Sequence, residues 1–300
     1  MTQNLYNKQY WVGVDGGGTK CRAELFNFEG DSLGYGLGGP ANTAKYGEQA
    51  LQAILTAVQG AVSQAGLHFA DVSDELVVSA GLAGAYLASS QVLLSQWQHP
   101  FAHWTFSSDL HTALLGAHGG DDGVVVITGT GSCAALLYQG TVIQYGGYGF
   151  QLGDQASGAW LGQKAVQQAL LMADKLSSES QLWQAVSEFY QCPAPADLVE
   201  RLNTAQPGEF ARFAPALFEL AKTDPAAKAI INEGADYLNQ LIRRTLHNGN
   251  LPVTLTGGLA SLWQPLLDPA IAVLVKPAQY GPEWGAVLLA RQQTEPASQA

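Results

Sequence analysis

The chain has 300 residues, of which 47% are hydrophobic and only 13% charged, and its formal net charge at pH 7 is −11. This composition is too apolar and too weakly charged for a disordered chain. The acidic balance argues against binding to nucleic acid or to anionic membranes, because both need clusters of Lys and Arg. Glycine is unusually abundant, with 34 copies, and it predicts many places where the backbone approaches another group closely.

The three cysteines are widely spaced and form no CxxC pair, which excludes a zinc or iron–sulfur site built from cysteines alone. The first ten residues are polar and lack the apolar core of a signal peptide. The longest apolar runs are far shorter than the roughly 20 residues of a membrane span. Together these features predict a cytoplasmic protein with free thiols.

The first half of the chain alternates predicted strands and helices. The segment YWVGVD at 10–15 has the pattern of a buried strand, and it runs into a glycine loop at 16–19. A second strand follows directly, so the loop is expected to join two strands of a hairpin. The expected strands are 10–15, 20–28, 32–37, 76–79 and 104–107, and the expected helices are 45–65, 85–98 and 109–117.

The opening pattern returns after the turn at 119–123. The apolar segment VVVI at 124–127 is followed by a second glycine loop and two more strands. We interpret this as an internal duplication; the alternative is that two such hairpins arose by chance in a glycine-rich chain. The expected strands are 124–127, 133–138, 141–145, 253–255 and 271–275, and the expected helices are 158–174, most of 180–248 and about 282–293.

Strands alternate with helices in both halves, which predicts an α/β fold, and the length predicts two domains. The predicted N-terminal domain is 1–118 and the predicted C-terminal domain is 119–300. The second domain is expected to hold an α-rich insertion at about 158–248.

Three glycine motifs compete as phosphate-binding loops. The run GVDGGGTK at 13–20 misses the P-loop pattern, since a residue separates the last glycine from the lysine and a strand follows. The run GYGLGG at 34–39 fits GxGxxG by its letters but opens no helix, so it is a weak dinucleotide signal. The third reading is a pair of loops, 15–19 and 129–132, whose backbone N–H groups and hydroxyls could bind one triphosphate from two sides. Either loop alone could be a simple hairpin turn.

From about Trp11 to Leu289 the chain resembles the N-acetylglucosamine kinases and bacterial glucosamine kinases of the sugar kinase/heat-shock protein/actin superfamily. These enzymes are relatives of the benzoyl-CoA reductase activating ATPases. The segments that carry the resemblance are VGVDGGGTKCRA, SSDLHTALLGAHGG, ITGTGSC and GGYGFQLGDQASGAWLG. The resemblance implies two ribonuclease-H-like domains with a duplicated strand–glycine loop–strand core. It also implies that the last helix packs back on the first domain.

The resemblance assigns roles to individual residues. Asp109 matches the catalytic aspartate that takes the proton from the sugar 6-hydroxyl, although its position between a strand and a helix also fits a simple N-cap. Asp15 is expected to hold Mg²⁺ directly or through water. The expected ATP-binding residues are Gly16, Gly17, Gly18, Thr19, Lys20, Gly129, Thr130, Gly131, Ser132, Gly257 and Gly258. The expected sugar-binding residues are Asn42, Asp109, Thr130, Gly147, Tyr148 and Asp154.

The resemblance therefore implies ATP- and Mg²⁺-dependent transfer of a phosphoryl group to the 6-hydroxyl of glucosamine or N-acetylglucosamine. Gly81 and Ala83 stand where mammalian N-acetylglucosamine kinase has serines, and Gln155 stands where it has a glutamate. These departures slightly favour glucosamine, whose cationic amine would suit an acidic pocket. The expected partners are ATP and an amino sugar, with a homodimer as an option. Two alternatives stay open: an activator-type ATPase, whose paired cysteines this chain lacks, and a non-enzymatic ATP-gated sensor.

Overall fold

The computed structural model describes residues 10–246 and 249–294. The expectation for the polar N-terminal segment therefore lies almost entirely outside the described residues. The chain divides into two compact units, each of which is described by itself. Unit 1 contains the residues up to Asp122 together with those from Pro277 onward, and unit 2 is Gly123–Lys276. Each unit has a mixed β-sheet and helices, so the predicted α/β class is confirmed.

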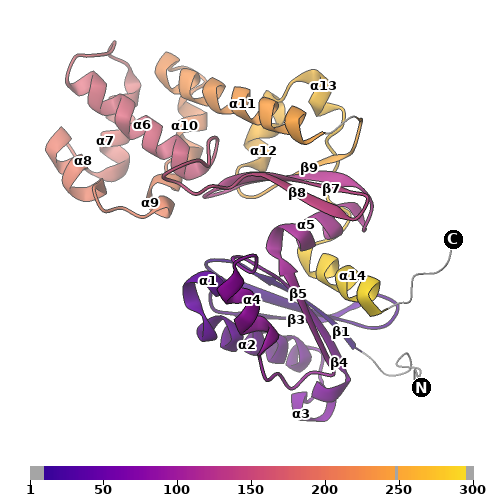
Figure 1. The fold of residues 1–300 in the computed structure, drawn as a ribbon. Helices are drawn as coiled ribbons and strands as arrows, with labels where there is room; N and C mark the ends of the chain where they lie inside the picture. The colour runs from indigo at the N-terminus through magenta and orange to yellow at the C-terminus, as the bar shows by residue number, and fades with distance from the viewer. Residues whose placement is uncertain (1–9, 247–248, 295–300) are drawn as a thin grey trace. The chain divides into compact units, whose positions relative to one another are not determined.

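Unit 1 has a five-stranded sheet with the order β3-β2-β1-β4-β5 (Figure 1). The first three strands form an antiparallel meander, and β4 and β5 continue the sheet in parallel with β1. The strands are β1 (Tyr10–Gly16), β2 (Cys21–Phe26), β3 (Ser32–Gly38), β4 (Leu76–Leu82) and β5 (His103–Ser108).

Helices cover both faces of this sheet. Val12 and Val14 of β1 belong to one hydrophobic cluster with α2, whereas Trp11 belongs to a second cluster with Val287 of α14. Because alternate residues of a strand point to opposite faces, α2 and α14 lie on opposite faces. The helices of unit 1 are α1 (Thr43–Tyr46), α2 (Glu48–Gln64), α3 (Phe69–Val72), α4 (Ala88–Ser95), α5 (Asp109–His118) and α14 (Pro282–Thr294), with a 3₁₀ turn η2 (Ser73–Glu75).

The glycine run at 34–39 is a packing surface. A Cβ atom on Gly36 would lie 2.1 Å from the carbonyl oxygen of Ala57, and one on Gly38 would lie 2.1 Å from that of Ala53. Real Cβ atoms do not approach other atoms this closely, so the strand needs glycine where it touches α2. The glycines of the GxGxxG pattern in this run are therefore explained by the close packing of β3 against α2. This agrees with the sequence analysis, in which the run was only a weak indication of dinucleotide binding.

Unit 2 repeats the strand arrangement of unit 1. Its four-stranded sheet has the order β8-β7-β6-β9, in which β6, β7 and β8 are antiparallel and β9 is parallel to β6. This order matches β3-β2-β1-β4, as the predicted duplication requires. The strands are β6 (Gly123–Thr128), β7 (Ser132–Tyr138), β8 (Thr141–Gly146) and β9 (Val253–Thr256).

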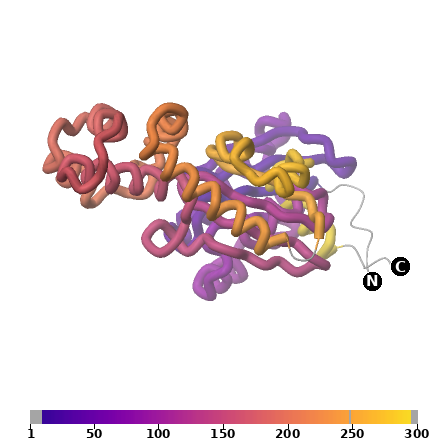
Figure 2. Tube along the Cα trace, turned by 90° about the horizontal axis from the view of Figure 1, so that it is seen from above, coloured from indigo at the N-terminus to yellow at the C-terminus, as the bar shows by residue number. Residues whose placement is uncertain are grey.

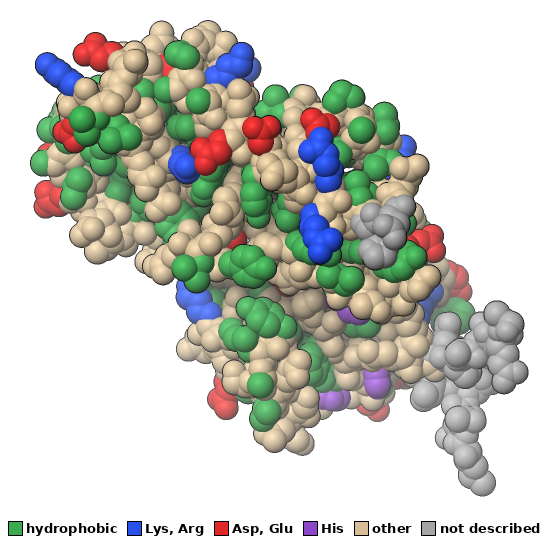
Figure 3. Space-filling view, turned by 45° about the horizontal axis from the view of Figure 1, so that its top comes forward, with side chains coloured by type: hydrophobic (Ala, Val, Ile, Leu, Met, Phe, Trp, Pro, Cys, Tyr) green, Lys and Arg blue, Asp and Glu red, His purple; other side chains and the backbone are tan. Residues whose placement is uncertain are grey.

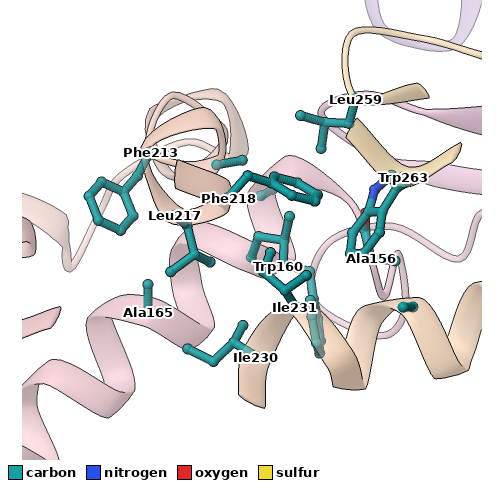
Figure 4. Close-up of a cluster of buried hydrophobic side chains, with 14 of the residues drawn as sticks. Ala156, Trp160, Ala165, Phe213, Leu217, Phe218, Ile230, Ile231, Leu259 and Trp263 are labelled. Carbon is teal, nitrogen blue, oxygen red and sulfur yellow. The ribbon is translucent and has the colours of Figure 1, made fainter. Parts of the chain in front are cut away.

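A long helical segment separates β8 from β9, and α11 returns along strands β6, β7 and β8 (Figures 1 and 2). The hydrophobic core of unit 2 includes Trp160, Phe218 and Trp263 (Figure 4). The indole N–H of Trp263 donates to the carbonyl of Ala156 at 3.1 Å, so this buried polar group is satisfied. The helices are α6 (Gly158–Ala173), α7 (Gln181–Tyr190), α8 (Pro195–Leu202), α9 (Pro207–Ala211), α10 (Ala214–Leu220), α11 (Pro225–Thr245), α12 (Ala260–Trp263) and α13 (Pro269–Ala272), with a 3₁₀ turn η3 (Gln264–Leu266).

Two element predictions were wrong in detail. The expected strand at 271–275 is occupied by the end of α13, and only Val275 forms a bridge, to Val253. A five-residue apolar run cannot distinguish a strand from a buried helical turn, and Pro269 favours a helix start. The expected helix at 45–65 is split at Gly47, which has φ 51° and ends α1.

Two observations concern a membrane or polyanion partner. None of the helices in the described ranges has both the length and the apolar character needed to cross a bilayer. On the face drawn in Figure 3, the Lys and Arg side chains of the described residues stand singly and form no basic patch.

Candidate functional site

The first glycine loop leaves β1 in unit 1 and is held by its carbonyl groups. The N–H of Gly17 donates to the carbonyl of Lys20 at 3.0 Å, which closes the hairpin turn. The carbonyl of Gly16 accepts from the N–H of Ala83 at 2.9 Å, and that of Gly17 accepts from Ala41 at 2.9 Å. Because neighbouring segments use these carbonyls, the loop has a defined orientation in which only the Gly17 N–H among its glycine-run donors is used within the described residues.

The N–H groups of Gly18 and Thr19 donate to no acceptor among the described residues. A Cβ atom on Gly18 would meet no heavy atom within 4 Å in that same part of the chain, apart from its own neighbours. Gly18 also lies outside the left-handed region. The fold itself therefore does not require glycine here. Consecutive free N–H groups without a shielding side chain are suited to binding an anion.

Asn42 is tied to the same loop. Its side-chain oxygen accepts from the N–H of Lys45 at 3.0 Å and caps α1. The next residue, Thr43, donates its N–H to the carbonyl of Ala83 at 3.0 Å, and Ala83 in turn donates to Gly16. The oxygen of Asn42 is thus used by the fold, and its NH₂ group is the part left to donate to a ligand.

Asp109 is the first residue of α5, and the interpretation as an N-cap was wrong. The cap is Ser108, whose hydroxyl oxygen accepts from the N–H of His111 at 3.2 Å. The Asp109 carboxylate accepts from the N–H of Leu110 at 2.9 Å. Burial raises the pKa of Asp109, while this N–H contact lowers it. The carboxylate keeps acceptor capacity that capping would otherwise use.

Asp15 lies beside other carboxylates in unit 1. The pKa of its carboxyl group is raised from 3.8 to about 6, first by burial and then by the charges of Glu283 and Asp109; Lys20 and Arg22 lower it. Glu283 is only 4% exposed. Sequence reasoning did not single it out, although its place in GPEWG at the start of the last helix was visible.

The carboxylate of Asp15 has surroundings that suit a magnesium ion. Mg²⁺ is usually bound by one or two carboxylates, together with substrate phosphates and water. Asp15 is a carboxylate whose charged form is disfavoured by its surroundings, so a cation beside it would relieve that cost. No cluster of three or more His, Cys, Asp or Glu side chains arranged to hold a metal occurs in the described ranges. Asp15 therefore fits a site completed by phosphate and water.

The second glycine loop leaves β6 in unit 2 and repeats the arrangement of the first. The carbonyl of Gly129 accepts from the N–H of Gly158 at 2.7 Å, and that of Thr130 accepts from Ala159 at 3.3 Å. The start of α6 thus orients the loop. In the described structure, the N–H groups of Thr130 and Gly131 donate to no acceptor. Two free N–H groups again remain at the end of a buried strand.

Asp154 and the stretch around Gly147 adjoin this second loop. The hydroxyl of Ser132 donates to the carbonyl of Gln155 at 2.6 Å, and the N–H of Gly147 donates to the carbonyl of Ser132 at 3.1 Å. Asp154 is 8% exposed and has φ 59°, a conformation that non-glycine residues seldom adopt. Its carboxylate accepts from the N–H of Gly149 at 3.2 Å, and burial raises its pKa.

The glycine pair after β9 touches the second loop. A Cβ atom on Gly257, which has φ 96°, would lie 2.4 Å from the carbonyl oxygen of Thr128. The N–H of Leu259 donates to the same carbonyl at 3.0 Å. Gly257 is therefore required by packing. Gly258 has open space around its Cβ position in the described structure.

A mostly apolar cavity of about 330 Å³ lies beside the helix that follows this glycine pair. The apolar side chains of Phe218 and Ile231 line it, both visible in Figure 4, and Asn232 and Ser261 add polar groups. Sequence reasoning missed these residues, because α10, α11 and α12 bring them together from distant parts of the chain. An apolar cavity with a few polar groups is suited to a flat heterocyclic ring.

The predicted site residues fall into two sets. Unit 1 brings together Asp15, the first glycine loop, Asn42 and Asp109, and unit 2 holds the predicted residues from Gly129 to Gly258. Two predicted residues differ from the others in their side-chain contacts. Lys20 is exposed and Tyr148 is 74% exposed, and neither side chain makes a hydrogen bond or ion pair within residues 10–246 and 249–294.

Comparisons with known proteins give consistent relatives. The sequence pattern of the BadF/BadG/BcrA/BcrD ATPase family matches residues 12–290. The chain is 34% identical over 270 residues to the glucosamine kinase of Vibrio cholerae serotype O1, covering 89% of this chain and 91% of that protein. It is 26% identical over 274 residues to the N-acetyl-D-glucosamine kinase of Dictyostelium discoideum, covering 84% and 86%. The solved structure of a candidate N-acetylglucosamine kinase from Chromobacterium violaceum matches with a TM-score of 0.85 and 35% identity, covering 94% of this chain and 99% of that one.

The raised pKa of Asp15 predicts a pH-dependent cost to folding. The folded state binds the Asp15 proton more tightly than the unfolded state, so stability from this group is present below pH 3.8 and is lost as the pH rises through about 6. Asp15→Asn removes that cost. In metal-free buffer, the variant is expected to be more stable than the wild type by up to about 3 kcal/mol at pH 7.5. The advantage should largely vanish at pH 4.0. Urea unfolding at both pH values measures it, and an equal difference at the two pH values would contradict the burial of this charge.

Proposed function

This chain belongs to the BadF/BadG/BcrA/BcrD ATPase family, and we propose that it is an amino-sugar kinase that phosphorylates the 6-hydroxyl of glucosamine or N-acetylglucosamine with ATP. The observation that carries the proposal is the pair of glycine loops at the ends of equivalent strands, each with two N–H groups that donate to no acceptor among the described residues. The likeness to curated glucosamine and N-acetylglucosamine kinases over most of the chain supports the substrate class.

Each unit, taken by itself, offers donors for the phosphate oxygens of ATP. In unit 1, the N–H groups of Gly18 and Thr19 are donors for phosphate oxygens, and in unit 2 those of Thr130 and Gly131 are equivalent donors. The adenine ring occupies the cavity beside α12, where apolar walls contact its faces and the polar groups bind to its edge. The triphosphate of ATP is anionic, and the whole chain carries a net charge of −11. The positive field that the triphosphate needs therefore comes from these N–H groups and not from the side chains.

Mg²⁺ is the natural counter-ion for this site. Asp15 would hold it directly or through water, and the ion would neutralise charge on the transferred phosphoryl group. The chain's own contribution is a buried carboxylate at the end of β1, next to the loop that offers phosphate donors.

Asp109 is the proposed general base. Its carboxylate accepts the proton of the sugar 6-hydroxyl as that oxygen bonds to the γ-phosphorus of ATP. The bond between the γ-phosphorus and the bridging oxygen breaks, and ADP leaves with the bonding electrons. Burial raises the pKa of Asp109, which makes it a better proton acceptor than an exposed aspartate.

Asp154 and Asn42 are proposed to orient the sugar. The buried carboxylate of Asp154 accepts hydrogen bonds from sugar hydroxyls, and the NH₂ group of Asn42 donates to them. The buried carboxylate of Asp154 also favours a cationic ligand, so we favour glucosamine over N-acetylglucosamine.

We place the enzyme in the cytoplasm, where ATP is available and where its three cysteines, none of which forms a disulfide, would stay reduced. The proposed partners are ATP and the amino sugar, without nucleic acid. A homodimer is compatible with this function and is not needed by it.

Sugar-dependent release of ADP tests the proposal directly. A coupled assay over glucosamine, N-acetylglucosamine, glucose, mannose and N-acetylmannosamine should give the highest kcat/KM with glucosamine, roughly tenfold or more above glucose. ADP release that does not respond to any sugar would instead favour an activator-type ATPase. ADP binding without turnover on any sugar would favour a sensor.

Asp109→Asn tests the general base. Loss of the proton acceptor should lower kcat about 10²- to 10⁴-fold, while nucleotide binding measured by calorimetry stays nearly unchanged. Asp71→Asn, an exposed aspartate in α3 of the same unit, is the matched control and should behave as the wild type. Turnover retained by Asp109→Asn would remove Asp109 from this role.

Ser261→Phe tests the adenine cavity. Ser261 is an exposed lining residue, so a larger side chain can fill the cavity without disturbing the core. The KM for ATP should rise at least about tenfold, and the KM for the sugar should not change. Gln52→Phe, at an exposed lining residue of a cavity of about 420 Å³ beside α2 in unit 1, is the control. Equal ATP kinetics in both variants would contradict the placement of adenine.

A further inference from the structure

Asp15 and Arg22 stand opposite one another on β1 and β2 but form no ion pair. They are Cα partners in the antiparallel register, so their side chains share one face with their Cβ atoms about 5 Å apart. Opposite charges in this arrangement attract each other. Among the ion pairs of the described residues, however, Arg22 contacts Glu283 and Glu24 and not Asp15.

The guanidinium of Arg22 is held on several sides. One nitrogen, Nη1, donates to Oε1 of Glu283 at 2.7 Å, and Nη2 lies 3.0 Å from Oε2 of Glu24. The centre of the guanidinium also lies 5.4 Å from the ring of Tyr35. The Glu283 side chain is only 5% exposed, so its contact with Arg22 is poorly screened by water and is the strongest of these interactions.

Glu283 owes its position to the approach of α14 to β1. Its carbonyl oxygen lies 1.7 Å from where a Cβ atom on Gly13 would stand, so the two backbones are in direct contact. Glu283 is therefore fixed beside β1, and its carboxylate binds the guanidinium of Arg22, the residue that stands opposite Asp15. Burial and, after it, the charges of Glu283 and Asp109 raise the pKa of Asp15. The guanidinium of Arg22 is meanwhile hydrogen-bonded to Glu283.

We infer that Glu283 is a positioning residue: by binding Arg22 it keeps the guanidinium away from Asp15 and so leaves Asp15 open to a divalent cation. The inference rests on the proposed function, in which Asp15 holds Mg²⁺. Without the Glu283 carboxylate, Arg22 is free to turn to the carboxylate opposite it and to occupy the place of the cation. The role depends on a specific contact between two side chains and differs from a general effect of charge.

A double-mutant cycle separates these two effects, with Mn²⁺ as the probe, since carboxylate sites that suit Mg²⁺ also bind Mn²⁺. Binding of Mn²⁺ in the presence of ADP is measured from the paramagnetic resonance signal of the free ion. Glu283→Gln is expected to weaken Mn²⁺ binding at least about tenfold when Arg22 is present, and by less than about threefold in the Arg22→Gln background. Circular dichroism checks that each variant is folded.

The same factor in both backgrounds would overturn the inference, because Glu283 would then act by its charge alone or as a ligand itself. Unchanged binding in Glu283→Gln would also overturn it. A second variant, Glu283→Asp, keeps the charge but shortens the reach to Arg22, and it is expected to weaken Mn²⁺ binding as Gln does; wild-type affinity would contradict the inference. If the wild-type protein with ADP binds no Mn²⁺, the proposed metal site is wrong and the inference fails with it, a result distinct from an equal factor in the two backgrounds.

Discussion

The backbone of α14 lies so close to β1 that only glycine fits at position 13. A second contact of the same kind joins α14 to α5, where a Cβ atom on Gly285 would lie 1.9 Å from the carbonyl oxygen of Thr112. Together these contacts pack the last helix of the chain against its first strand. They also place Glu283 near Asp15, where, after burial, the charge of Glu283 raises the pKa of Asp15. A larger side chain at either glycine would move the helix and with it the carboxylate of Glu283.

The glycines of this chain serve two different purposes. At Gly13 and Gly36 a Cβ atom would collide with backbone, so packing requires glycine there. At Gly18, Gly129 and Gly258 the space is open in the described structure, and none of the three has a left-handed φ. Glycine at these open positions has no role in the fold itself. This contrast supports the proposal that ligand phosphates and the nucleotide approach the backbone there.

Local patterns predicted much of the fold, and long-range contacts account for what they missed. The strand–glycine loop–strand hairpins could be predicted because each is encoded in a short run of neighbouring residues. The strand expected at 271–275 could not be, because a short apolar run does not specify its own backbone. Glu283 was missed because its importance comes from docking against residues at the other end of the chain. The roles of Asp109, Asn42 and Asp154 stay predictions, although the structure places each in a buried or loop-bound position.

The identity of the reaction product tests the central claim most directly. Phosphorus NMR of a reaction containing the protein, MgATP and glucosamine should show a new phosphomonoester signal coupled to the two protons on C6. That signal should appear in equal amount to ADP. Release of inorganic phosphate in place of the sugar phosphate, or a phosphate attached at another hydroxyl, would contradict the account.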